Sequence, residues 1–202
     1  MTTIEAGGGM DLRNETMLTL GDLIGFPTVT SDSNLDLISY CEDRLSRVGA
    51  DIAITRHPSE DKANLLATIG PRVDGGVVLS GHTDVVPADE DNWTGAPFLA
   101  MRREQRIYGR GAVDMKGFIA CVLASAPALA AADLARPVHI ALTFDEEVGC
   151  RGAPILVSEL VRTGPMPAAA IIGEPTEMRI IEGHKGMCEY TTRFTGLAGH
   201  GT

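Results

Sequence analysis

Short apolar runs alternate with longer amphipathic stretches along most of this chain. Apolar residues three and four positions apart predict helices, and short runs rich in apolar and β-branched residues predict strands. The predicted helices cover residues 16–24, 34–48, 115–131 and 153–162. The predicted strands cover residues 51–55, 65–69, 77–80, 138–144 and 169–172. For the helix at 34–48, Ser33 is the expected N-terminal cap and Gly49 the expected end.

Three of these strands, at 77–80, 138–144 and 169–172, are apolar at nearly every position. Continuous apolar runs are typical of strands buried on both faces of a sheet. Because these strands alternate with helices, we expect the α/β class: a mostly parallel, twisted sheet flanked by helices.

The pattern changes near residue 175. Segments 178–181 and 187–195 alternate more and are β-rich, which indicates the beginning of a second, α+β domain. We therefore divide the chain into a loose tail at 1–14, a catalytic domain at 15–178 and the start of the second domain at 179–202.

Composition and charge exclude several classes of function for this chain. The chain has 202 residues, of which 44% are hydrophobic and 22% charged, as in ordinary globular proteins. Its formal charge of −10 disfavours nucleic acid and anionic membrane surfaces as partners. We find no run of about twenty apolar residues and no secretory signal, so we expect no membrane span and a cytoplasmic location. The four scattered cysteines are expected to be free thiols.

Metal-type side chains follow three of the predicted strands. His82 and Asp84 come after the strand at 77–80, Glu146 and Glu147 after the strand at 138–144, and Glu174 after the strand at 169–172. Asp114 lies just before a predicted helix. In open α/β sheets, sites form at the carboxyl ends of the strands.

Each of these residues has an ordinary explanation when it is taken singly. A histidine after a strand can be a loop residue, Asp114 can be a helix cap, and Asp84 can form a turn before Pro87. Together, one imidazole and several carboxylates at one sheet edge suit zinc and related divalent cations. The number of carboxylates suggests two metal ions.

Five ordered motifs carry a resemblance: GHTDVVP, GRGAVDMKG, TFDEEVGC, IIGEPTEM and the segment Glu182-Gly183-His184-Lys185-Gly186. They resemble those of the metal-dependent hydrolases that include acetylornithine deacetylase, succinyl-diaminopimelate desuccinylase, aminoacylases and glutamate carboxypeptidases. The resemblance runs from about residue 18 to residue 202. Family chains are nearly twice as long, so it covers their N-terminal part only.

The resemblance implies a role for each motif residue. His82 and Glu174 would bind one metal ion, Glu147 the other, and Asp114 would bridge the two. Glu146 would be the general base. The resemblance implies roles for three further residues.

Asp84 would accept the second N–H of His82 and so orient its ring. His200, in the segment Gly196-Leu197-Ala198-Gly199-His200, would donate to the oxyanion from the lid domain, although Gly201 and Thr202 depart from the small Ser or Ala residues that usually follow. Trp93 would lie near the site entrance.

Among these enzymes, the residue sequences of the motifs are most similar to those of the acetylornithine deacetylases. The resemblance therefore implies deacetylation of N2-acetyl-L-ornithine in arginine biosynthesis. The complete enzyme would hold two Zn²⁺ or Co²⁺ ions and form a homodimer through the lid domain that begins at 179–202. The alternative substrates are those of succinyl-diaminopimelate desuccinylase, related metallo-carboxypeptidases or aminoacylases. A last histidine ligand would lie outside this sequence, so we expect the 202-residue chain to be inactive alone. A non-catalytic metal-binding fragment stays open as an alternative of another class.

Overall fold

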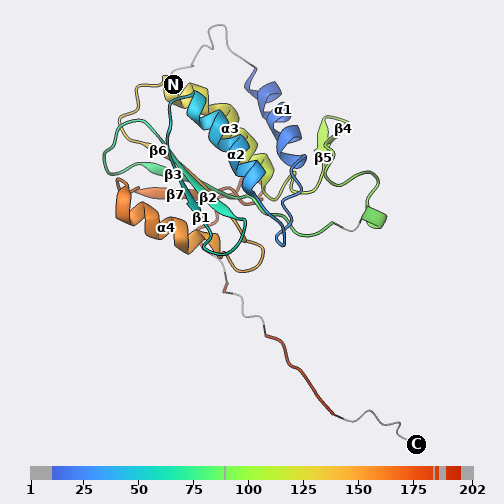
Figure 1. The fold of residues 1–202 in the computed structure, drawn as a ribbon. Coiled ribbons are helices and arrows are strands. Elements are labelled where there is room, and N and C mark those ends of the chain that lie inside the picture. Colours follow the sequence, from blue (N-terminus) through green and yellow to red (C-terminus); the bar gives the residue numbers. More distant parts are fainter. Residues whose placement is uncertain (1–10, 89, 184, 187–189, 197–202) are drawn as a thin grey trace, which may run out of the picture.

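The computed structural model describes residues 11–88, 90–183, 185–186 and 190–196. Figure 1 shows a central sheet between two layers of helices. The helices are α1 (Leu12–Ile24), α2 (Leu35–Arg47), α3 (Lys116–Ala131) and α4 (Gly152–Thr163), with a short 3-10 helix at Glu90–Asn92. The strands are β1 (Asp51–Arg56), β2 (Ala63–Ile69), β3 (Val77–His82), β4 (Met101–Arg103), β5 (Arg106–Tyr108), β6 (Val138–Thr143) and β7 (Ala169–Ile172). The α/β class is confirmed.

The main sheet has the strand order β1-β2-β6-β3-β7. Strand β6 pairs with β3, and β3 with β7, in parallel. Strand β2 is antiparallel to both β1 and β6. Four of the five strands therefore point the same way, and β2 alone runs against them, so the sheet is mixed in its pairing.

Alternate side chains of the strands face two separate cores. Leu65, Ala67 and Ile140 pack with α1, α2 and α3 in the larger cluster. Leu66 and Ala141 pack with α4 in the smaller one. Burial on both faces explains why these strands are apolar throughout.

Helix α1 begins earlier than predicted. Asp11 caps it, because its carboxylate accepts a hydrogen bond from the Arg13 amide at 3.2 Å. Residues 12–14 therefore belong to the helix and not to a loose tail. At α2 the prediction holds more closely, since the Ser33 hydroxyl accepts from the Leu35 amide at 3.2 Å.

The β4–β5 hairpin was not predicted. Its turn consists of Glu104 and Gln105, which both have positive φ, at 50° and 62°. Turns of this kind usually carry Asn-Gly or Asp-Gly, and that signal is missing here.

Two predictions about the end of the chain are wrong. Strand β7 was predicted to be buried, but all four of its residues are exposed, because it lies at the sheet edge with β3 as its one partner in the described part. Residues 178–181 form no strand, and Met178 and Ile180 are 99% and 90% exposed. A strand needs a neighbour to pair with, and in Figure 1 this segment extends away from the sheet.

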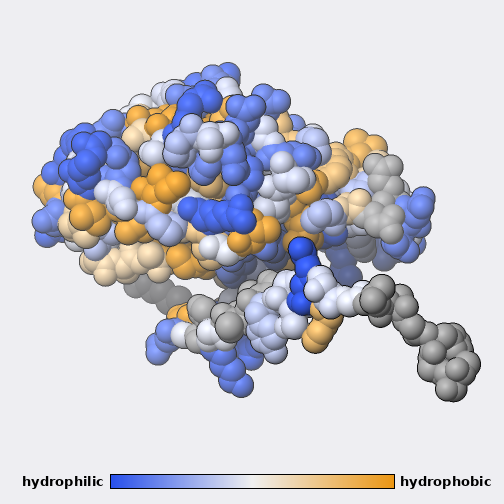
Figure 2. All heavy atoms as spheres, turned by 60° about the horizontal axis from the view of Figure 1, so that its bottom comes forward, coloured by the Kyte–Doolittle hydropathy of each residue, from blue (hydrophilic) through white to orange (hydrophobic). Residues whose placement is uncertain are grey.

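The surface mixes polar and apolar residues. In Figure 2, hydrophobic side chains reach the surface at several places among hydrophilic ones. Among the helices that the structure describes, none has both the length and the apolar character required to cross a membrane.

Candidate metal centre

The three parallel strands bring their carboxyl ends to one edge of the sheet. In the register, His82 of β3 lies opposite Thr143 of β6, and Ser80 of β3 lies opposite Ile172 of β7. The residues that follow β6 and β7 therefore emerge beside His82. This is where open α/β sheets place their sites.

His82 is the buried centre of the site, with its side chain 1% exposed. Its Nδ1 lies 2.8 Å from the backbone carbonyl of Asp84, which can only accept, so Nδ1 carries a proton. Its Nε2 faces carboxylates: Asp114 Oδ1 lies at 3.0 Å, Glu174 Oε1 at 3.8 Å and Glu146 Oε2 at 4.0 Å. The Nε2 lone pair of a neutral ring would thus point into a group of negative oxygens.

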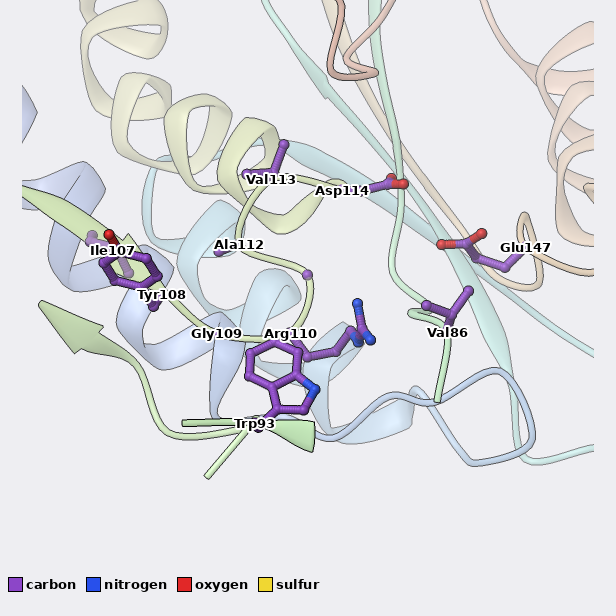
Figure 3. A pocket seen from close by; sticks show the side chains of 11 residues that line it. Val86, Trp93, Ile107, Tyr108, Gly109, Arg110, Ala112, Val113, Asp114 and Glu147 are labelled. Atoms are coloured by element: carbon purple, nitrogen blue, oxygen red, sulfur yellow. The ribbon is translucent and has the colours of Figure 1, made fainter. Parts of the chain in front are cut away.

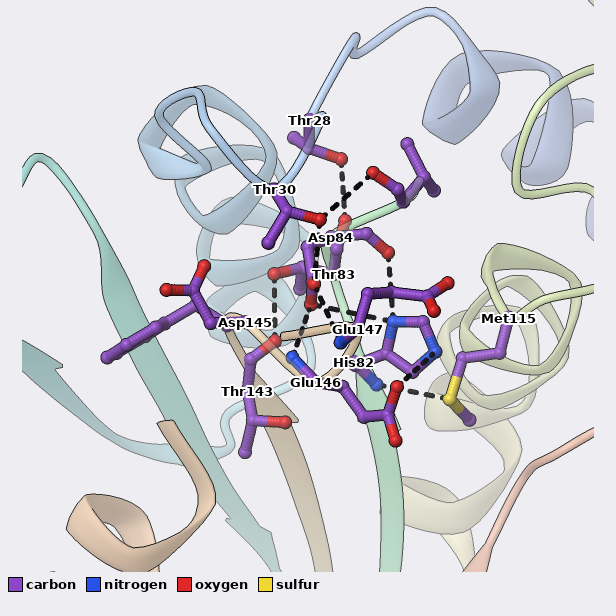
Figure 4. Close-up of polar contacts among 12 residues, drawn as sticks. Thr28, Thr30, His82, Thr83, Asp84, Met115, Thr143, Asp145, Glu146 and Glu147 are labelled. Carbon is purple, nitrogen blue, oxygen red and sulfur yellow. Dashed lines mark hydrogen bonds and ion pairs between the residues drawn. The ribbon is translucent and has the colours of Figure 1, made fainter. Parts of the chain in front are cut away.

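The carboxylate of Asp84 has a different role from the predicted one. Its Oδ1 lies 3.5 Å from His82 Nδ1, farther than the backbone carbonyl of the same residue. The two carboxylate oxygens instead accept hydrogen bonds from the backbone amides of Glu146, at 3.0 Å, and Glu147, at 3.2 Å. Figure 4 shows these contacts around the His82 ring. Asp84 therefore holds the Glu146–Glu147 turn with its side chain and the imidazole with its backbone.

Two groups of ligand-type atoms share His82. In one, His82 is grouped with Glu146 and Glu147; in the other, with Asp114 and Glu174. Within each group the atoms lie within 4.8 Å of one another. All four predicted metal ligands are thus brought together, and Glu146 joins them. His200 lies outside the described residues.

The electrostatics of the site reflect crowded carboxylates. Burial alone would lower the pKa of His82, but the Asp84 and Asp114 carboxylates outweigh burial and raise it to about 9. The pKa of Glu147 is raised by burial and by repulsion from Asp114. Burial and the neighbouring carboxylates likewise raise the pKa of Glu174. A cation at this place would relieve the repulsion.

A pocket of about 270 Å³ opens beside the metal-type residues. Asp114 and Glu147 lie at one end, and the rings of Trp93 and Tyr108 line the other (Figure 3). The Arg110 guanidinium stacks over the Trp93 ring at 5.2 Å. Its Nη2 donates to the Pro87 carbonyl at 3.1 Å, which ties this wall to the loop after β3. Trp93 thus lines the pocket beside the metal-type residues, and its place at the site entrance stays a prediction.

Sequence reasoning missed two residues beneath the site. Lys62, at the start of β2, makes a buried ion pair with Asp145 at 2.6 Å. Thr30 donates through its hydroxyl to Asp84 Oδ2 at 3.4 Å. The one feature of the sequence that could have indicated a buried role for Lys62 is its place directly before the mostly apolar run at 63–69.

The comparisons with known proteins agree with this geometry. Residues 78–193 match Peptidase family M20/M25/M40. The chain is similar to the acetylornithine deacetylase of Proteus mirabilis (strain HI4320), at 38% identity over 199 residues. That alignment covers 95% of this chain and 50% of the relative, so the chain spans about half the length of this curated relative.

Solved structures show the same fold. Human carnosine dipeptidase 1 has a TM-score of 0.69 and 24% identity, over 79% of this chain and 38% of that one. An M20 family metallo-carboxypeptidase from Sulfolobus solfataricus also has a TM-score of 0.69, with 22% identity, over 81% of this chain and 37% of that one. With the family match extending over more than half of the sequence, and with the motif residues gathered at one sheet edge, the chain belongs to peptidase family M20/M25/M40.

Proposed function

We propose that this chain carries the metal-binding part of an amidohydrolase that removes acetate from N2-acetyl-L-ornithine. The observation that carries the proposal is the orientation of His82. Its Nδ1 is committed to a carbonyl, so its Nε2 faces the carboxylates of Asp114, Glu146 and Glu174. A divalent cation satisfies both the imidazole lone pair and the carboxylates. The 38% identity to an acetylornithine deacetylase supports the choice of substrate.

The donor set fits two cations. His82 and Glu174 would hold one, Glu147 the other, and Asp114 would bridge them; the group of His82, Asp114 and Glu174 supports the first of these positions. Two divalent ions supply polarisation of an amide carbonyl and a lowered pKa for water. Zn²⁺ and Co²⁺ both suit one imidazole with several carboxylates.

Glu146 is suited to the proton transfers. Its amide is anchored on Asp84, while its side chain is 38% exposed at the mouth of the site. A carboxylate held this way can take the proton of the attacking water and deliver it to the leaving amine. The adjacent pocket, with aromatic walls and Arg110, provides room for an N-acyl amino acid.

The remaining parts of the proposal concern the whole protein. In this proposal the catalytic domain comprises residues 12–178, with all of α1, and 179–202 begin a lid domain through which two copies pair and to which His200 belongs. The enzyme acts in the cytoplasm, in arginine biosynthesis. The 38% identical relative, an acetylornithine deacetylase, supports the enzymatic part of this assignment.

Calorimetric titration with Zn²⁺ or Co²⁺ tests the metal centre. His82→Ala is expected to weaken binding of one ion at least tenfold, because that ion loses its one imidazole ligand among the described residues. His57→Ala is the matched control, since His57 packs against Phe144 and belongs to neither group. Equal affinities for the two variants would overturn the assignment.

The substrate is tested in the complete protein, with N2-acetyl-L-ornithine and N-succinyl-LL-diaminopimelate compared as kcat/KM. We expect faster hydrolysis of the acetyl compound. A preference for the succinyl compound would replace the proposed activity with desuccinylation.

A further inference from the structure

A buried ion pair lies directly beneath the candidate site. Lys62 Nζ is 2.6 Å from Asp145 Oδ1, with the two side chains 9% and 2% exposed. Removing two charges from water costs free energy that their attraction seldom exceeds. Stability of the fold alone therefore does not account for this pair, and its location under the Glu146–Glu147 turn suggests a role in the site.

Asp145 has a backbone conformation that non-glycine residues avoid. Its φ is +56°, in the left-handed region. Such a conformation persists only where the surrounding structure enforces it. Asp145 comes two residues after the end of β6, and its left-handed turn directs the next two amides, of Glu146 and Glu147, toward Asp84.

The Asp145 carboxylate depends on Lys62 for its partner. Its other oxygen, Oδ2, is buried and makes no hydrogen bond within the described part of the chain. The Arg151 guanidinium approaches Oδ2 at 3.9 Å, but its side chain is 61% exposed. An exposed arginine at that distance contributes little compared with a buried lysine at 2.6 Å.

Lys62 also reaches the other side of the turn. Its Nζ donates to the Thr30 carbonyl at 2.7 Å, and the Thr30 hydroxyl donates to Asp84 Oδ2 at 3.4 Å. The Lys62 ammonium group thus connects Asp145, which begins the turn, with Asp84, which binds the amides of the turn. The connection to Asp84 runs through Thr30. Figure 4 shows Thr30, Asp84 and Asp145 on one side of the His82 ring.

The geometry points to Lys62 as a positioning residue for Glu146: it holds Asp145 in the left-handed conformation and thereby fixes the turn that presents the general base. This inference rests on the proposed function of Glu146. Lys62 acts through Asp145 and Thr30, and contacts no reacting atom.

The test compares Lys62→Met with the double variant Lys62→Met/Asp145→Gly. Methionine keeps much of the length of lysine without its charge, so Asp145 would leave its buried position and the turn would shift. Glycine adopts positive φ without strain and carries no charge to bury. The double variant should therefore restore the turn. Arg72→Met is the matched control, because it removes an exposed ion pair with Asp51.

Hydrogen exchange of the Glu146 and Glu147 amides gives a readout that does not need activity. In Lys62→Met we expect these two amides to exchange about tenfold faster or more, while β6 keeps its protection. The double variant should recover protection, and Arg72→Met should not change it. In the complete enzyme, kcat should fall about tenfold to a hundredfold in Lys62→Met, with KM nearly unchanged, and recover in the double variant.

Unchanged exchange of the two amides in Lys62→Met would overturn the inference, as would a double variant no better than the single one. If Lys62→Met does not fold, the double variant becomes the test. A folded double variant with protected Glu146 and Glu147 amides would support the inference, and any other result would overturn it. A wild-type enzyme without hydrolytic activity would contradict the proposed function, and the exchange data would still test the role of Lys62.

Discussion

At the residue scale, the residue that positions the site, Asp84, differs from the residues whose side chains are proposed to act, the base Glu146 and the metal ligand Glu147. Asp84 uses both carboxylate oxygens to bind the amides of Glu146 and Glu147 and its carbonyl to bind His82. Those hydrogen bonds fix three neighbours, and Oδ2 also accepts from the Thr30 hydroxyl. Asp84 anchors Glu146 and Glu147 through their backbone amides, and the one hydrogen bond to the Glu146 carboxylate in the described part of the chain is a weak one from the Cys150 thiol at 3.6 Å.

Glu146→Gln tests this separation in the complete enzyme. Glutamine keeps the shape and the anchored amide but cannot accept a proton, so kcat should fall about 10²–10⁴-fold. Metal content, measured by atomic absorption, should remain close to that of the wild type. Glu42→Gln, on the exposed side of α2, is the control. Near-normal kcat at full metal occupancy would show that another group is the base.

Cys41 illustrates the effect of burial on a single thiol. Burial raises its pKa to about 12, against an ordinary value near 9. The folded state thus favours the neutral thiol, so this contribution to stability is present below pH 9 and is lost as the pH rises above it. In native protein at pH 8, iodoacetamide should label the exposed Cys121 and Cys150 and leave Cys41 unmodified. Labelling of Cys41 at the same rate would contradict its burial.

At the element scale, one asparagine joins α2 to the sheet. Asn34 Nδ2 donates to the Ala63 carbonyl at 2.8 Å and to the Thr83 hydroxyl at 2.9 Å. Its Oδ1 accepts from the Ala63 amide at 2.9 Å. The start of α2 is thereby attached to β2 and to the loop that follows β3 and His82.

Asn34→Ala should lower the free energy of unfolding by about 2–3 kcal/mol, because it removes the side-chain partners of the buried amide and carbonyl of Ala63, whereas the Thr83 hydroxyl keeps its bond to the Thr143 carbonyl. Ser33→Ala, which removes only an exposed capping bond, should cost about 0.5–1 kcal/mol. Urea denaturation followed by circular dichroism measures both. Equal losses would indicate that the Asn34 bonds are replaced by water.

At the scale of the whole molecule, the sheet has an exposed edge. Ile171 and Ile172 of β7 are 52% and 57% exposed, and β3 is the one neighbour of β7 among the described residues. An exposed apolar edge strand offers unpaired backbone groups to other chains. The chain spans about half the length of its curated relative, which has further residues that could cover such an edge.

We expect the 202-residue chain to self-associate as its concentration rises, and Ile171→Lys to reduce this association. A charged side chain on an edge strand disfavours pairing with a second copy. Val157→Lys adds the same charge on the outer face of α4, where Val157 is 54% exposed. Sedimentation velocity should show a smaller effect for that control. If Ile171→Lys and Val157→Lys reduce self-association equally, the association depends on net charge and not on pairing at the β7 edge.

The sequence by itself determined the class of fold and the residues at the strand ends. Apolar runs mark strands buried on both faces, as at residues 138–143, since burial dictates residue type. His82, Asp114, Glu147 and Glu174 could be singled out because their side chains are of the types that bind metals and their surrounding motifs resemble those of the family. Both signals are local, and both can be read from residues close together in the chain.

Only the tertiary structure decided what depends on distant neighbours. Lys62 and Asp145 are 83 positions apart, and no local pattern pairs them. The partners of Asp84 are backbone amides, which leave no mark on residue type. Strand β7 has the composition of a buried strand yet is exposed, because burial depends on which elements pack beside a strand and not on its own residues.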